Sequence, residues 1–93
     1  MRRIPNRRGH RDSIDIVADI LKASLGGAKK TQLMYNCNLS FRQLESYLGL
    51  LLEKNLLRCK SVKRSRSSTI YEITEKGQEF LRSYKILKSF IST

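Results

Sequence analysis

Apolar residues recur at helical spacing near the start of the chain. Between residues 12 and 25 they form one stripe, interrupted by acidic positions, and its members are Ile14, Val17, Ile20, Leu21 and Leu25. Because a spacing of three or four residues brings side chains onto one face, the stripe predicts an amphipathic helix. Asp12 or Ser13 can cap its beginning, and the glycine pair at 26–27 ends it.

The pattern then predicts two more helices joined by a short connection. The first runs from Thr31, its expected cap, to about Asn36, and residues 37–39 form the connection. The second begins at Ser40, which is followed three positions later by Gln43, the spacing of a capping box. Its inward stripe is the strongest in the chain and comprises Phe41, Leu44, Leu48, Leu51 and Leu52.

The second half of the chain predicts a hairpin and a long final helix. Asn55 tolerates the left-handed backbone that ends the preceding helix. Residues 56–62 and 69–73 have strand patterns, and the polar residues 63–68 between them form the tip of a hairpin. The final helix runs from about residue 75 to residue 91 and carries a heptad-spaced seam of Phe80, Tyr84, Leu87 and Ile91.

This order of elements is that of an α+β winged helix-turn-helix, with three helices, a two-stranded β-hairpin wing and a C-terminal helix. We therefore divide the chain into a basic flexible arm (1–11), a winged-helix domain (12–74) and a C-terminal helix (75–93). The seam on the final helix can pack on the first helix of the same chain or on a second copy. We favour a homodimer, because this helix carries more apolar surface than so small a body is expected to leave exposed.

Positive charge is concentrated in two segments. The 93 residues carry 19 Lys and Arg against 8 Asp and Glu, which gives a formal net charge of +11. Residues 1–11 and 58–66 each hold five basic residues and no acid, so the rest of the chain is nearly neutral. One such run is usually a solvated surface, but two runs flanking a helix-turn-helix favour double-stranded DNA as the partner.

The helix-turn-helix supplies the candidate DNA contacts. Its second helix is expected to enter the major groove and to lead with its N-terminal residues, here Ser40, Arg42, Gln43 and Ser46. Arginine can pair with guanine and glutamine with adenine, although both are also ordinary surface residues. Phosphate contacts are expected from the start of the preceding helix, the wing and the arm, with the candidates Lys29, Lys30, Thr31, Lys63, Arg64, Arg66, Arg7 and Arg8.

The same segments resemble a known family. The stretches AKKTQLMYNCNLSFRQL (28–44), YLGLLLEKNLL (47–57) and YEITEKGQEFL (71–81) are similar to the small winged-helix proteins of archaea, and the match runs roughly from residue 12 to residue 85. The resemblance implies a winged-helix fold, duplex DNA binding and a role as a predicted transcriptional regulator. In some members it implies a chromatin-like role and dimerisation through an antiparallel coiled coil of the last helix. Asn55 stands where the family commonly has glycine, the final helix is shorter than in those dimers, and the arginine-rich arm is not part of the resemblance.

The sequence offers no candidate for catalysis, for a cofactor or for a metal. One histidine (His10) and two separated cysteines (Cys37 and Cys59) do not make a zinc site, and we expect both cysteines to be buried or half-buried. Residues 26–31 do not make a phosphate loop, because the glycine spacing is wrong and the segment follows a helix. No apolar run is long enough to span a membrane and no secretory signal opens the chain, so we expect a cytoplasmic, nucleoid-associated protein. No ligand pocket is evident from the sequence.

Three functions remain open on these grounds. The first is a homodimeric, sequence-specific transcriptional regulator, which we favour. The second is an architectural chromatin protein that coats duplex DNA with little sequence preference, which the charge permits. The third is a protein-interaction module, because winged helices also serve that role. RNA binding is weaker, since no aromatic platform lies among the basic residues.

Overall fold

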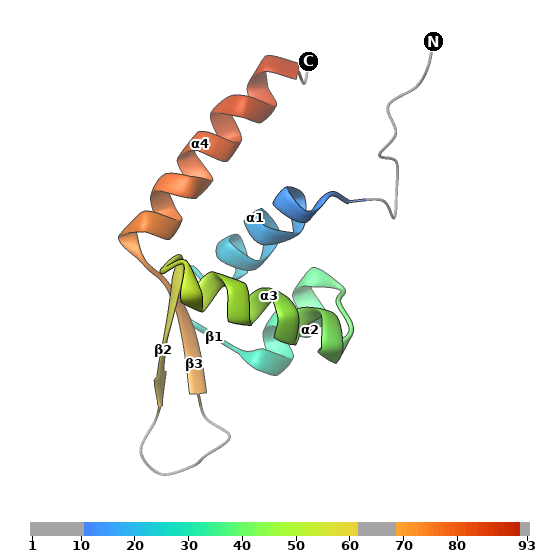
Figure 1. The fold of residues 1–93 in the computed structure, drawn as a ribbon, viewed down its shortest axis with the longest axis vertical. Helices are drawn as coiled ribbons and strands as arrows, with labels where there is room; N and C mark the ends of the chain where they lie inside the picture. Colours follow the sequence, from blue (N-terminus) through green and yellow to red (C-terminus); the bar gives the residue numbers. More distant parts are fainter. Residues whose placement is uncertain (1–10, 62–68, 92–93) are drawn as a thin grey trace.

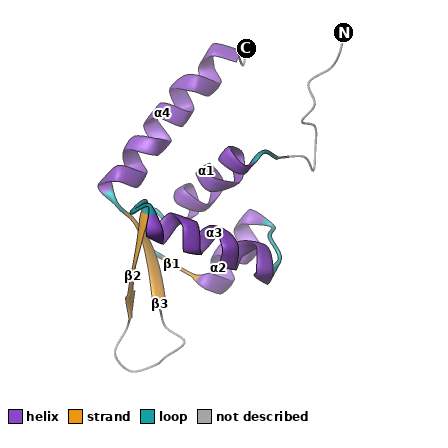
Figure 2. Ribbon diagram, in the orientation of Figure 1, coloured by secondary structure: helices purple, strands orange, loops and turns teal. Residues whose placement is uncertain are grey.

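The computed structural model describes residues 11–61 and 69–91, and its backbone follows the predicted order of elements (Figure 1). Its helices are α1 (Ser13–Ala23), α2 (Lys30–Cys37), α3 (Phe41–Glu53) and α4 (Glu75–Ile91). Its strands are β1 (Ala28–Lys29), β2 (Leu57–Ser61) and β3 (Thr69–Ile73). The first three helices gather into one body, from which the hairpin and α4 extend in opposite directions (Figure 2). The predicted winged helix-turn-helix fold is confirmed.

The sheet contains one strand more than the sequence predicts. Its antiparallel order is β1-β3-β2, so β3 lies in the centre. The additional strand, β1, pairs Ala28 with Tyr71 and Lys29 with Ile70. Two residues cannot display the alternation that identifies a strand, and the partner of β1 lies far along the chain. The sheet therefore ties the start of α2 to the hairpin.

A single core joins all four helices to the sheet. It is built from one side of each element, and its most buried large side chains are Ile20, Leu21, Leu33, Leu44, Leu51 and Leu57. Tyr71 and Ile73 of β3 and Leu81 of α4 complete it. In α4, Gly77 lets the helix approach the sheet, because a Cβ at this position would lie 2.4 Å from the carbonyl oxygen of Leu56.

Several predicted core positions are exposed instead. Ile14 and Leu25 lie at the two ends of the stripe of the first helix, and both reach solvent. Phe41 lies at the first turn of α3 and is also exposed, as is Cys59 on the edge strand β2. The physical reason is size: a body of three short helices covers the middle of each apolar stripe but not its ends. The expectation that Cys37 is buried is confirmed.

Candidate nucleic-acid interface

The turn between α2 and α3 is fixed by its backbone and by one buried side chain. Asn38 ends α2 in the left-handed conformation, with φ of 55°. The next amide, that of Leu39, donates to the carbonyl oxygen of Met34 at 3.1 Å, and the Leu39 side chain is buried in the core. The left-handed residue reverses the chain and the buried leucine anchors it. The two helices are thereby held in the fixed relation that a helix-turn-helix requires.

Helix α3 begins with the predicted capping box. The Ser40 hydroxyl accepts from the backbone N–H of Gln43 at 3.1 Å, and the Gln43 Oε1 accepts from the backbone N–H of Ser40 at 3.0 Å. The cap therefore engages the acceptor atom of Gln43. A bidentate contact with adenine uses both the oxygen and the nitrogen of the amide, so a Gln43 that contacts adenine must share its oxygen with the cap or leave the cap.

The outer face of α3 is polar and accessible. Ser40, Arg42, Gln43 and Ser46 are all exposed, and Arg42 and Ser46 lie opposite the buried leucines of the helix. Arg42 forms no ion pair with any residue in 11–61 or 69–91. Its guanidinium is therefore available to a partner, and its five donors suit the acceptors of guanine or a phosphate.

The start of α2 presents its three predicted contacts differently. Lys29 and Thr31 are exposed, but the cap position belongs to Lys29, whose backbone N–H donates to the Gln32 Oε1 at 2.8 Å. The prediction of Thr31 as the cap is wrong, because β1 holds Lys29 in the extended conformation that precedes the helix. The ammonium of Lys30 is bound within the chain: it lies 2.5 Å from Glu45 on α3, and this hydrogen bond raises the pKa of Lys30.

The hairpin shows how some of the basic charge is balanced. On its described part, Arg58 and Lys60 of β2 each lie 3.2 Å from the Glu72 carboxylate of β3. Hydrogen bonds from Lys60 and Arg58 lower the pKa of Glu72. The other predicted contacts of the wing and arm, Lys63, Arg64, Arg66, Arg7 and Arg8, lie outside the described residues.

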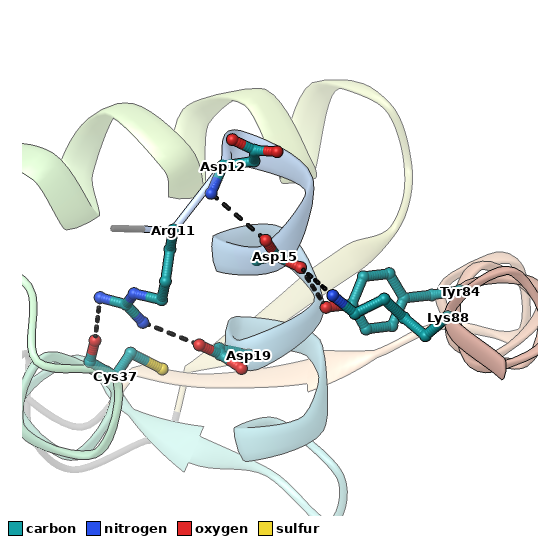
Figure 3. Close-up of polar contacts among 7 residues, drawn as sticks. All are labelled: Arg11, Asp12, Asp15, Asp19, Cys37, Tyr84 and Lys88. Carbon is teal, nitrogen blue, oxygen red and sulfur yellow. Dashed lines mark hydrogen bonds and ion pairs between the residues drawn. The ribbon is translucent and has the colours of Figure 1, made fainter. Parts of the chain in front are cut away.

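Arg11, the last residue of the predicted arm, is bound to the body of the protein. Its guanidinium donates to Asp19 of α1 at 2.7 Å and to the carbonyl oxygen of Cys37, the last residue of α2, at 2.9 Å (Figure 3). Asn36 and Gln43 line a hollow of about 460 Å³ beside it. Arg11 therefore satisfies a carbonyl at the end of α2 and fixes the start of α1 next to the helix-turn-helix turn.

Asp15 joins α1 to α4. Its carboxylate accepts a hydrogen bond from the Tyr84 hydroxyl, and the Lys88 ammonium lies 3.4 Å from the same oxygen (Figure 3). The hydrogen bond from Tyr84 lowers the pKa of Asp15. Burial and the same hydrogen bond raise the pKa of Tyr84 to about 12. These contacts fix the direction in which α4 leaves the body.

The predicted dimerisation seam divides into two parts. Phe80 and Tyr84 pack against the core of their own chain, whereas Leu87 and Ile91 are exposed. The exposed apolar surface lies on the last turns of α4, where the helix extends beyond α1 (Figure 1). We call this surface the α4 end, and its residues are Ile86, Leu87, Phe90 and Ile91.

Sequence reasoning missed three features of this region. Glu45 and Phe41 hold Lys30, Arg11 caps α2, and the Tyr35 side chain on α2 is 84% exposed. The first two are contacts between residues far apart in the sequence, which leave no local pattern. The described residues contain no group of three metal-ligating side chains, and none of their helices has the length and apolarity needed to cross a bilayer.

The sequence and the fold are similar to those of known proteins. Residues 10–92 match the winged helix-turn-helix family. The chain is 35% identical over 72 residues to the uncharacterized protein MJ0290 of Methanocaldococcus jannaschii, covering 76% of this chain and 31% of that protein. It thus spans less than a third of the length of this relative.

Solved structures show the same architecture. Sso10a-2, a DNA-binding protein from Sulfolobus solfataricus, superposes with a TM-score of 0.76 at 25% identity, covering 86% of this chain and 81% of that one. FabT of Streptococcus pneumoniae, solved in complex with DNA, gives a TM-score of 0.67 at 17% identity over 91% of this chain and 60% of that one, a likeness of fold. The relatives from Methanocaldococcus and Sulfolobus agree with the resemblance to small winged-helix proteins of archaea. The chain belongs to the winged helix-turn-helix family.

Proposed function

We propose that this protein binds double-stranded DNA and acts as a sequence-specific transcriptional regulator, with α3 in the major groove. The observation that carries the proposal is the outer face of α3, where the exposed Arg42 has no ion-pair partner among the described residues. An arginine in the first turns of a recognition helix can pair with guanine O6 and N7. The similarity to Sso10a-2, which is a DNA-binding protein, supports the same assignment.

Phosphate contacts supply most of the affinity in this proposal. Lys29 and Thr31 are exposed at the start of α2, where free backbone amides and the helix dipole also favour an anion. Ser40 and Ser46 flank Arg42 on the exposed part of α3. The basic residues of the wing and the arm extend the contact along the backbone, with Lys63, Arg64, Arg66, Arg7 and Arg8 as the candidates.

We also propose that the protein is a homodimer joined through the α4 end. Phe90 and Ile91 are 75% and 77% exposed, and no residue in 11–61 or 69–91 covers them. Four apolar side chains on two turns of helix are a surface that a second copy of the same helix can bury. A dimer places two copies of α3 on one duplex, so its binding site consists of two half-sites with fixed spacing.

The test is selection of bound duplexes from a random library, followed by affinity measurements on the selected and on random sequences. Arg42→Ala should weaken binding to the selected duplex by about fivefold to 150-fold, the range expected for loss of one bidentate base contact worth about 1–3 kcal/mol. On random duplex it should lose only one charge contact. The matched control is Arg82→Ala, which removes an exposed arginine from α4.

The possible outcomes separate the candidate functions. An enriched motif of two half-sites, with a larger loss of affinity for Arg42→Ala on that motif than on random duplex, supports a dimeric regulator. Binding of duplex without an enriched motif, or an equal loss for Arg42→Ala on both kinds of duplex, supports an architectural DNA-binding protein instead. Absence of duplex binding at moderate salt refutes the proposal and leaves a protein-interaction module.

A further inference from the structure

The ammonium of Lys30 is held between two side chains of α3. Glu45 Oε2 lies 2.5 Å from the Nζ atom, and the centroid of the Phe41 ring lies 5.1 Å from it. Phe41 and Glu45 are four residues apart and thus lie on the same side of α3, the side that faces α2. Lys30 is the first residue of α2. One side chain of α2 and two of α3 therefore form a single unit, which we call the Lys30 cradle.

The cradle explains an aromatic ring that the core does not use. Phe41 is 55% exposed, although a phenylalanine at the first turn of an amphipathic helix is expected to point inward. A cation above the face of an aromatic ring is attracted by the ring electrons. The ring thus supports the Lys30 ammonium from one side while the Glu45 carboxylate binds it from another.

The cradle remains open to solvent on the surface assigned above to DNA. The side chains of Lys30 and Glu45 are 34% and 46% exposed, so a phosphate can approach both. Glu45 lies between Arg42 and Ser46 on one side and α2 on the other, within the same two turns of α3. Its carboxylate is therefore close to any duplex that contacts Arg42.

Charge decides what such a pair contributes to binding. A lysine strengthens duplex binding when it neutralises a phosphate and releases a counterion. In the cradle, Glu45 already neutralises Lys30, so the pair has no net charge to attract a phosphate. A phosphate that displaces Glu45 from Lys30 also leaves the carboxylate facing the negatively charged backbone.

We propose that Glu45 is a specificity-determining residue that withholds Lys30 from the phosphate backbone and so lowers the affinity for duplex of arbitrary sequence. This inference rests on the proposed function, because it requires that α2 and α3 face DNA. It also changes the role of Lys30. The charge of the lysine predicted as a phosphate contact is balanced by its partner, and Arg42, which no described acid neutralises, gains a larger share of the selection between sequences.

The experiment is a double-mutant cycle on the salt dependence of binding to a random-sequence duplex. In the native background, Lys30→Ala should leave the slope of log K against log salt unchanged, because Lys30 releases no counterion. Glu45→Gln should steepen the slope by about 0.9, the value for one phosphate contact, and raise the affinity about fivefold to tenfold at about 0.1 M salt. The double variant should return to the native slope.

Glu53→Gln is the matched control. It removes the same charge from an exposed position of the same helix, and Glu53 forms no ion pair with a described residue. It should raise affinity through net charge alone, and Lys30→Ala should remain without effect on the slope in its background. All variants are first compared with the native protein by thermal unfolding, so that only folded proteins enter the cycle.

Two outcomes overturn the inference while leaving the proposed function intact. One is a loss of slope for Lys30→Ala that is equal in the native and Glu45→Gln backgrounds, because Lys30 then contacts phosphate despite Glu45. The other is a Glu45→Gln variant that changes thermal stability but not the slope, which would make the pair merely structural. A native protein that binds no duplex refutes the proposed function, and this inference with it.

Discussion

The two ends of α4 differ in almost every physical respect. Its beginning is held by the Thr74 hydroxyl, which accepts from the backbone N–H of Gly77 at 3.0 Å, and its first two turns lie against the core, where Leu81 is 6% exposed. Its last turns, from Ile86 onward, present apolar side chains to solvent. One continuous helix thus contains a seated segment, which packs on the core through Phe80, Leu81 and Tyr84, and a last segment whose apolar side chains are left exposed by residues 11–61 and 69–91.

The difference separates two uses of apolar residues. In the seated segment they stabilise the chain's own fold, and their partners lie on α1 and the sheet. In the α4 end they add little to that fold, because side chains that remain mostly exposed gain little burial energy. The Asp15 contacts of Tyr84 and Lys88 mark the boundary between them. Substitutions in the seated segment should therefore change the free energy of unfolding, whereas substitutions in the α4 end should change the oligomeric state.

The largest effect on folding is expected for Gly77→Ala. A Cβ at this position would lie 2.4 Å from the Leu56 carbonyl oxygen and 2.6 Å from the Ile73 side chain, so α4 must move away from the sheet. Overpacking of this kind should lower the free energy of unfolding by about 3 kcal/mol. Urea denaturation measures it, and unchanged stability would show that the seated segment can shift freely.

Gly49→Ala provides the contrasting control. Gly49 lies inside α3, and a Cβ there would have no atom within 4 Å. Alanine should therefore raise the free energy of unfolding by about 0.5–1 kcal/mol, the helical preference of alanine over glycine.

A smaller effect is expected for Tyr84→Phe, which removes the hydrogen bond to Asp15 but keeps the ring. We expect a loss of about 1 kcal/mol near neutral pH for this partly buried bond. Because folding lowers the pKa of Asp15, its contribution is present above the unfolded value and is lost as the pH falls through the folded value. Tyr84 has its folded pKa raised to about 12, so its contribution is present below about pH 10 and is lost between there and about pH 12.

Denaturation of the native protein and of Tyr84→Phe across pH checks both signs. The variant should show a smaller decline at high pH, because the contribution of the Tyr84 hydroxyl is gone, and a smaller decline in acid. Identical pH profiles for the two proteins would mean that Asp15 and Tyr84 are not coupled in solution.

Phe90→Ser should have the smallest effect on the fold. It is also the most direct test of the difference between the seated segment and the α4 end. The side chain is 75% exposed, so the free energy of unfolding in dilute solution should change by less than about 0.5 kcal/mol. Sedimentation equilibrium should show a native dimer and a variant shifted towards monomer. A native protein that is monomeric at all concentrations refutes dimerisation through the α4 end, whereas a variant that unfolds easily refutes the division of α4.

The sequence predicts the elements whose signals are local. The bounds of α4 and β3 and the Ser40–Gln43 capping box follow from neighbouring residues, and the structure confirms them. Whether a helix face is covered depends on distant parts of the chain: Ile14, Leu25 and Phe41 continue apolar stripes past the point that residues 11–61 and 69–91 cover. The same limit applies to the candidate interface, where the sequence supplies Arg42 but not the partner that occupies Lys30.

The two-residue strand β1 has a consequence for the order of folding. It pairs residues 28 and 29 with residues 71 and 70, which are separated by more than forty positions, whereas the hairpin of β2 and β3 and the turn between α2 and α3 form between near neighbours. Closing so long a loop costs more chain entropy than closing a short one. We therefore expect the amides of β1 to become protected from hydrogen exchange late in refolding and to open early in the native state. The attachment of α2 to the sheet is then the point at which α2 and α3 can change their angle to the hairpin while both parts remain folded.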